Sequence, residues 1–243
     1  MNTPIVFLHG WGLNGRIWHA LVESLPERAC LAPDLPGYGN APFVTPYDPD
    51  TLADRLATSA PAILVGWSLG GLVALAWAAR RPDTVRGLVL VGATPAFVRR
   101  DDWPHGMATE LFDEFARALA QDWRATLQRF LALQARGGEA ARRVIERLRA
   151  ELFAHGEPVP ETLAAGLELL RNTDLRPRLP AVRCPTLIVH GGHDTLCPPA
   201  AAEWLAANLA HARLALLPRA AHAPFLSHPD EFVARLTEFI DGL

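Results

Sequence analysis

The stretch Ile63-Leu64-Val65-Gly66-Trp67-Ser68-Leu69-Gly70-Gly71 decides the fold of this chain. The apolar run before Gly66 predicts a buried strand, and the alanine-rich pattern after Ser68 predicts a helix. Between them lies Gly-x-Ser-x-Gly, a tight strand-to-helix turn that holds a serine in a strained and exposed position. Because strand and helix converge here, we expect a Cβ atom at Gly66 or Gly70 to collide with backbone. The turn therefore predicts a nucleophile at Ser68.

The composition is that of one large domain, or of one domain with an insertion. The chain has 243 residues, of which 50% are apolar and 20% charged, which is enough for a substantial core. A net charge of −3 argues against a general nucleic-acid binder. The three cysteines, Cys30, Cys184 and Cys197, form neither a disulfide framework nor a metal-ligand pattern. We also expect no signal peptide and no membrane span, and therefore a soluble protein of the cytoplasm. We further expect it to be a monomer.

Strand and helix patterns alternate along most of the chain. Apolar runs predict strands at residues 4–8, 29–32, 62–65, 85–91, 185–190 and 213–217, with helical patterns between them. This alternation predicts an α/β fold with a mainly parallel, doubly wound sheet. From Phe97 to Leu175 only helical patterns occur, and they predict an inserted four-helix cap that includes a third helix from Glu139 to Phe153. We therefore divide the chain into a core, residues 1–96 and 176–243, and a cap, residues 97–175.

Ser68 has a candidate base and a candidate acid later in the chain. A serine hydroxyl needs an adjacent base, and an imidazole base needs a carboxylate to orient it. Asp194 follows the predicted strand at 185–190, and His222 follows the last predicted strand. Since parallel strands end at one edge of the sheet, Ser68, Asp194 and His222 should meet there. Asp34 is the reserve candidate for the acid.

The loop His9-Gly10-Trp11-Gly12 follows the first predicted strand. We expect the backbone N–H groups of Trp11 and Leu69 to form an oxyanion hole, and His9 to be a structural residue bonded to backbone. Together with Ser68, these groups predict acyl transfer from an ester to water, a reaction that needs no metal or organic cofactor.

Four motifs carry a resemblance along nearly the whole chain: residues 9–12, Asp34-Leu35-Pro36-Gly37, residues 66–71 and Ala221-His222-Ala223-Pro224-Phe225. In these motifs the chain resembles the α/β-hydrolase superfamily. The resemblance implies the α/β-hydrolase fold and the chain order of nucleophile, acid and base.

A narrower resemblance lies in the turn and the cap. The segments Gly66–Leu72, Asp102-Trp103, Gly106-Met107 and Arg129-Phe130-Leu131-Ala132-Leu133-Gln134 resemble the carboxylesterases of biotin synthesis that act on pimeloyl-[acyl-carrier protein] methyl ester. The resemblance implies release of methanol from that ester. It also implies a substrate channel whose lining is Trp11, Ser68, Leu69, Phe130, Leu131, Ala132, Leu133, Gln134 and His222.

The cap is locally rich in arginine, with eight arginines between Arg117 and Arg149. Such a surface suits an anionic partner, and the resemblance implies an acyl-carrier protein. Arg129, Arg142 and Arg143 are the preferred contacts. Ala125 and Glu146 stand where the resembled esterases keep arginine, so we expect a rearranged docking surface.

Other functions share this constellation. A general esterase of small, short-chain esters, an enol-lactonase or a carbon–carbon bond hydrolase would use the same three residues, because the cap decides the substrate. A ligand receptor on the same fold, with little turnover, is the alternative from a different class.

Overall fold

The computed structural model describes residues 3–58, 60–134, 142, 144–150 and 158–243. One sheet of six parallel strands has the order β2-β1-β3-β4-β5-β6. The strands are β1 (Ile5–Leu8), β2 (Cys30–Leu31), β3 (Ala62–Trp67), β4 (Val85–Val91), β5 (Thr186–Gly191) and β6 (Ala212–Leu217). This sheet confirms the predicted α/β class. The strand order reverses between β1 and β3, which is where ligands bind in open parallel sheets.

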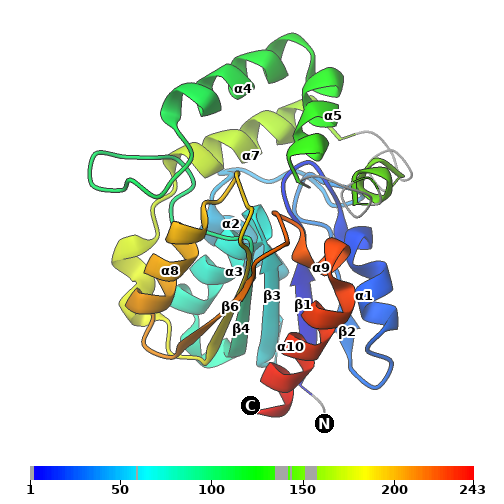
Figure 1. The fold of residues 1–243 in the computed structure, drawn as a ribbon, viewed down its shortest axis with the longest axis vertical. Coiled ribbons are helices and arrows are strands. Elements are labelled where there is room, and N and C mark those ends of the chain that lie inside the picture. Colours follow the sequence, from blue (N-terminus) through cyan, green and yellow to red (C-terminus); the bar gives the residue numbers. More distant parts are fainter. Residues whose placement is uncertain (1–2, 59, 135–141, 143, 151–157) are drawn as a thin grey trace.

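Helices cover both faces of the sheet, with α10 in front and α3 behind in the view of Figure 1. They are α1 (His19–Glu23), α2 (Pro49–Leu56), α3 (Leu69–Arg80), α8 (Pro199–Asn208), α9 (Pro224–Ser227) and α10 (Pro229–Asp241), with short 3₁₀ turns at Gly15–Trp18, Pro82–Thr84 and Arg176–Ala181. Residues 69–78 of α3 are all buried. Strands β1, β3 and β5 are buried throughout, as expected of a parallel sheet with both faces covered.

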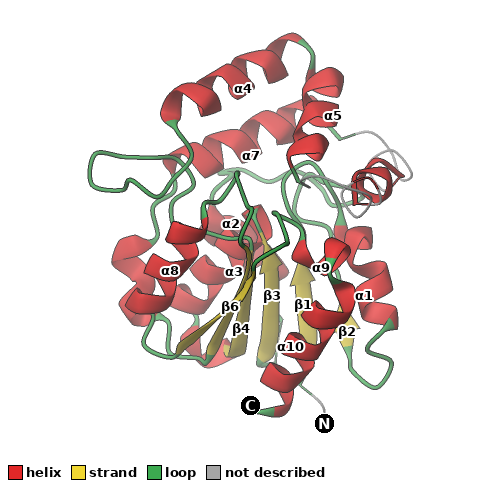
Figure 2. Ribbon diagram, viewed as in Figure 1, coloured by secondary structure: helices red, strands yellow, loops and turns green. Residues whose placement is uncertain are grey.

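A second layer of helices lies beyond the carboxyl ends of the strands (Figure 2). It consists of α4 (Thr109–Gln121), α5 (Trp123–Leu133) and α7 (Pro160–Asn172), together with a helical stretch at residues 144–150. All of them come from the chain between β4 and β5. The predicted third cap helix includes that stretch, while residues 139–141, 143 and 151–153 of the prediction lie outside the described residues. The limits of the cap at residues 97 and 175 stay a prediction.

The chain between β4 and α4 is a loop held by backbone and side-chain hydrogen bonds, and it is not a helix. Isolated bridges join Val98 to Met107 and Arg100 to Trp103, and the Trp103 indole N–H donates to the Ala96 carbonyl at 2.8 Å. The sequence predicted only helical patterns after Phe97. It missed this pairing because isolated bridges have no residue periodicity.

Among the described residues, no helix is both long and apolar enough to cross a membrane.

Candidate active site

Ser68 occupies the turn between β3 and α3 in a strained conformation, but it is buried and not exposed as the turn predicts. Its φ is 55° and its ψ −115°, and it is the only described non-glycine residue with a positive φ. Such a conformation costs about 1–3 kcal/mol and persists only where the surroundings enforce it. The Ser68 N–H donates to the Val91 carbonyl of β4 at 3.0 Å, and its carbonyl accepts from the Leu72 N–H of α3 at 3.1 Å. Backbone bonds on both sides therefore hold the serine at the sheet edge.

The flanking glycines allow this close approach. A Cβ atom at Gly66 would lie 2.4 Å from the Gly70 carbonyl oxygen, and one at Gly70 would lie 2.3 Å from the Leu8 carbonyl oxygen. Real Cβ atoms essentially never approach backbone this closely. The steric role predicted for both glycines is confirmed.

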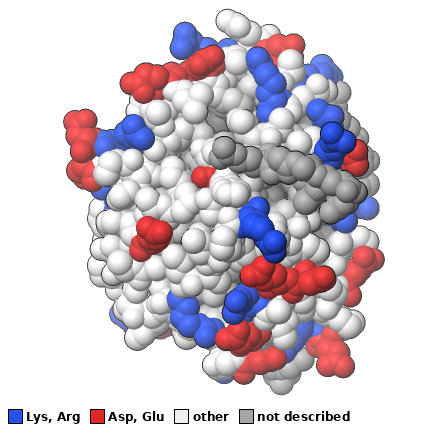
Figure 3. Space-filling model, viewed as in Figure 1, with Lys and Arg blue, Asp and Glu red and all other residues white. Residues whose placement is uncertain are grey.

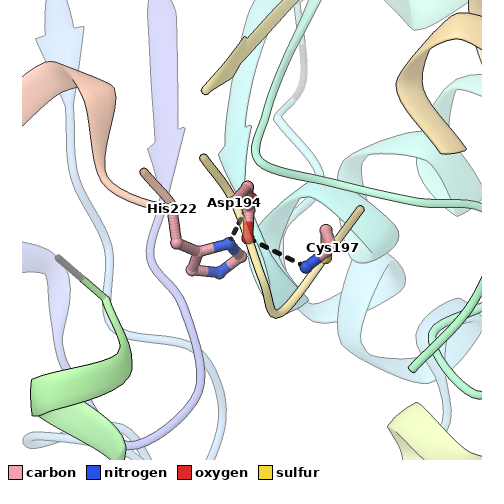
Figure 4. Close-up of side chains that lie close together, drawn as sticks. All are labelled: Asp194, Cys197 and His222. Carbon is pink, nitrogen blue, oxygen red and sulfur yellow. Dashed lines mark hydrogen bonds and ion pairs between the residues drawn. The ribbon is translucent and has the colours of Figure 1, made fainter. Parts of the chain in front are cut away.

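Asp194 and His222 lie side by side in the loops after β5 and β6 (Figure 4). The His222 Nδ1–H donates to Asp194 Oδ2 at 2.7 Å, and both side chains are almost fully buried. Asp194 Oδ1 accepts the backbone N–H groups of Leu196 and Cys197, each at 2.9 Å. The carboxylate is therefore fixed by its own loop, and it fixes the histidine tautomer that leaves Nε2 free to accept a proton.

Several contacts bring this pair to Ser68. The indole N–H of Trp67, the residue before Ser68, donates to the His222 carbonyl at 2.8 Å. Gly92, which follows β4, lies against His222 and Asp194, where a Cβ atom would be 3.2 Å from His222 Nδ1 and 3.4 Å from Asp194 Oδ2. His222 Nε2 is buried and has no hydrogen-bond partner among the described residues, Ser68 included. Nucleophile–base bonds are often long in unliganded sites and tighten around the substrate.

The reserve acid, Asp34, has a different place. Its Oδ1 accepts the Gly15 N–H at 2.8 Å and its Oδ2 accepts the Asn40 N–H at 3.0 Å. Asp34 thus ties together two loops, and no hydrogen bond joins it to His222 in the described chain.

His190, the penultimate residue of β5, also contacts Asp194, although no sequence pattern singles it out. Its Nε2 lies 2.7 Å from the Cys197 carbonyl oxygen, to which it donates, and 3.4 Å from Asp194 Oδ2. Burial lowers the pKa of His190, so the ring is neutral and its proton lies on Nε2. His190 therefore supports the turn that carries Asp194. The spacing of four residues between His190 and Asp194 did not indicate this contact, because the two side chains meet only where the loop after β5 turns back on the strand.

The candidate oxyanion donors lie at two element ends. Leu69 is the first residue of α3, so its N–H has no partner within the helix, and Trp11 follows β1. Beside them, His9 Nδ1 donates to the Gly10 carbonyl at 2.9 Å and His9 Nε2 accepts the Leu35 N–H at 2.9 Å. Burial lowers the pKa of His9 to about 4, so this ring is neutral and structural, as predicted.

An apolar cavity of about 120 Å³ lies between the cap and the core. Trp11 forms part of its wall, and so do Thr195 and Leu196, which directly follow Asp194. The rest of the wall is apolar: Phe97, Met107, Leu111, Phe112, Phe115, Phe130, Leu133, Leu167 and Leu170. Such a space suits an alkyl chain.

The predicted substrate segment spreads over several faces of α5. Phe130 and Leu133 line the cavity, and the Phe130 ring meets the Trp11 ring edge-on at 5.0 Å. Leu131 and Gln134 are buried, whereas Ala132 is exposed and lines a separate outer hollow. A helix turns by 100° per residue, so five consecutive residues cannot all face one cavity.

The predicted docking arginines are described in part. Arg129 on α5 and Arg142 are exposed, and the Arg129 guanidinium donates to Thr126 Oγ1 at 3.2 Å. Arg143 lies outside the described residues. On the face shown in Figure 3, basic side chains gather at the upper right, the region of α5.

The comparisons with known proteins agree with this geometry. The profile described as "Alpha/beta hydrolase family" matches residues 5–235. A pimeloyl-[acyl-carrier protein] methyl ester esterase from Chromobacterium violaceum is 44% identical over 243 residues, which cover 99% of this chain and 95% of that protein. One from Nitrosomonas europaea is 43% identical over 237 residues, 96% of this chain and 94% of that protein. Among solved structures, an esterase from Exiguobacterium antarcticum is 27% identical, with a TM-score of 0.90 over 99% of this chain and 92% of that one.

The chain belongs to the α/β-hydrolase family. Within this family it belongs with the esterases just named and is a carboxylic ester hydrolase.

Proposed function

We propose that this enzyme hydrolyses the methyl ester of pimeloyl-[acyl-carrier protein] to methanol and the free carboxylate, a step of biotin synthesis. The observation that carries the proposal is the buried Asp194–His222 pair beside Ser68 on its strained turn. The relatives that are 43–44% identical to the chain carry the name of this activity. We further propose that the enzyme acts as a cytoplasmic monomer, without nucleic acid or membrane.

The proposed chemistry is acyl transfer through an acyl-enzyme. Ser68 Oγ attacks the ester carbonyl while His222 Nε2 takes the hydroxyl proton, and His222 then gives that proton to the departing methoxide. Asp194 orients the imidazole and stabilises its charged form. The N–H groups of Trp11 and Leu69 stabilise the oxyanion, a contribution of about 3–4 kcal/mol for one donor in comparable enzymes. Water, activated by His222, then releases the acid.

The alkyl chain of the substrate would occupy the apolar cavity. Phe130 and Leu133 line it, and Leu131 and Gln134 hold α5 in place from its buried side. Ala132 lies outside the cavity on the exposed face. A chain of methylene groups gains about 0.8 kcal/mol per buried CH₂ in such a space.

The carrier protein would dock on the cap. Arg129 and Arg142 are exposed there, and Arg143 is the third arginine of the proposed surface. Guanidinium groups suit the carboxylates of an acidic partner, and they act mainly on the rate of association and on its salt dependence.

The first experiment compares wild type with Ser68→Ala on the carrier-linked methyl ester and on a short p-nitrophenyl ester. We expect wild type to cleave both and the variant to cleave neither. Turnover of the short ester alone would refute the carrier-linked substrate and leave a general short-chain carboxylesterase. Failure of a fluorophosphonate to label Ser68 would refute the catalytic assignment and favour a receptor.

A second experiment tests docking. Arg129→Glu combined with Arg142→Glu should raise KM for the carrier-linked ester roughly tenfold and leave the short ester unaffected. The matched control is Arg183→Glu, an exposed arginine before β5 at the opposite end of the sheet. Equal KM values in all three proteins would contradict docking on this part of the cap.

A further inference from the structure

Cys197 lies in the turn that holds the candidate acid, and its side chain has no part in the proposed reaction. One ligand atom from each of Asp194, Cys197 and His222 lies within 4.8 Å of the other two, and all three residues are buried. The sequence spacing of the cysteines had shown no metal-ligand pattern. The fold creates one by bringing the loop after β6 against the loop after β5 (Figure 4).

We propose that Asp194, Cys197 and His222 form an inhibitory binding site for a borderline or soft divalent cation such as Zn²⁺ or Cd²⁺. The inhibition rests on the proposed role of His222 as the base, whereas the binding does not. The donor set is one thiolate, one imidazole and one carboxylate, the ligand types that Zn²⁺ takes in proteins.

The three ligand atoms need shifts of roughly 1 Å to bind one cation, because they now lie within 4.8 Å of one another. Zinc bonds to sulfur, nitrogen and oxygen of about 2.0–2.3 Å place tetrahedral ligands roughly 3.3–3.7 Å apart. The distance from Asp194 Oδ2 to His222 Nδ1 is 2.7 Å. These two atoms must therefore move apart by roughly 0.6 Å to bind one zinc ion. Asp194 Oδ1 keeps its bonds from the Leu196 and Cys197 amides while Oδ2 turns to the cation.

To bind the cation, the buried thiol of Cys197 must lose its proton. A divalent cation between sulfur and carboxylate supplies the positive charge that the buried thiolate lacks. Thiolate formation releases one proton to solvent for each cation bound.

Binding of the cation removes the base. The proton on His222 Nδ1 gives way to the metal and moves to Nε2, so the imidazole stays neutral. Nε2 then carries a hydrogen and has no lone pair to accept the Ser68 proton. Ester hydrolysis therefore stops, although neither Ser68 nor the oxyanion donors are touched.

The test titrates Cd²⁺ and Zn²⁺ into wild type, Cys197→Val, Cys197→Ala and the control Cys184→Ala, which removes another buried cysteine. Cadmium–thiolate absorption reports binding without turnover, and hydrolysis of a short p-nitrophenyl ester reports inhibition relative to each protein's own activity. We expect wild type and Cys184→Ala to bind one Cd²⁺ per chain and to lose activity, which a chelator restores. Both Cys197 variants should lack the absorption and need about 10- to 100-fold more metal for half inhibition.

Two results would overturn the proposal. One is wild type that shows no cadmium–thiolate absorption at stoichiometric metal. The other is inhibition that is equal in wild type and in both Cys197 variants. Ser68→Ala should still bind Cd²⁺, so a failed esterase assignment would leave the absorption intact and be recognised as a separate failure.

Discussion

Replacing Asp194 by Asn should abolish most turnover while leaving the fold intact. The amide oxygen of Asn can keep both bonds from the Leu196 and Cys197 N–H groups, which now reach Oδ1 at 2.9 Å. The amide NH₂ then faces His222 Nδ1 and donates to it, so the imidazole proton moves to Nε2, where it blocks the base. Flipping the amide would point NH₂ at two backbone N–H groups and cost about 2 kcal/mol or more. The flipped, active form is therefore no more than about 3% of the protein at that cost.

The fraction of Asp194→Asn in the flipped, active form sets the expected loss of kcat. The kcat for a short p-nitrophenyl ester should fall at least about 30-fold, and by up to about 10⁴-fold if the wrong tautomer dominates, as in other enzymes of this kind. Thermal unfolding should change little, because the backbone bonds persist. Asp34→Asn is the control and should keep wild-type kcat. A loss of less than tenfold in Asp194→Asn, or an equal loss in the control, would refute the reasoning.

Three further predictions concern stability. Gly70→Ala places a Cβ atom 2.3 Å from the Leu8 carbonyl oxygen, and it should lower the free energy of unfolding in urea by about 3 kcal/mol or more; an unchanged midpoint would contradict the steric argument. Burial lowers the pKa of His9 from 6.5 to about 4, so the unfolded chain binds a proton that the folded protein does not. Stability should therefore fall by up to about 3 kcal/mol as the pH drops from 6.5 to 4, and His9→Gln, compared by urea unfolding across that range, should flatten the slope. Trp11→Phe removes the indole N–H bond of 2.9 Å to the Leu163 carbonyl of α7, and a loss of about 1–3 kcal/mol in thermal unfolding is expected, whereas no loss would mean that the bond does not hold the cap.

The core of the fold was predictable because its signals are local. The helix predicted after Ser68 begins at Leu69, and the strand predicted at residues 85–91 has the bounds observed. Each is mostly apolar, and a glycine or proline follows within two residues of its end. The loop from Val98 to Met107 was not predictable, because two isolated bridges and one indole hydrogen bond hold it.

The residues of the candidate site also fall into those that local sequence patterns could place and those that only the fold brings together. Asp194 and His222 could be placed near each other because each follows a predicted strand, and parallel strands end at one edge. His190 and Cys197 could not, since their contacts with Asp194 depend on the reversal of one loop. The face that each residue of α5 presents also depends on how that helix packs against the core.

The apolar cavity and the exposed surface of the cap would recognise different parts of the substrate. The cavity wall is apolar apart from Thr195 and offers almost no hydrogen bonds to distinguish one acyl group from another. A hydrophobic pocket discriminates one methylene by about 1–3 kcal/mol, so esters of neighbouring chain length should differ in kcat/KM by no more than about 10- to 200-fold. Under the proposed function, selection of a carrier-linked ester over a free one would come from outside the cavity, where Arg129 and Arg142 are exposed. We therefore expect carrier-linked and free methyl pimelate to share a similar kcat and to differ in KM, and this difference should shrink as salt screens the arginines.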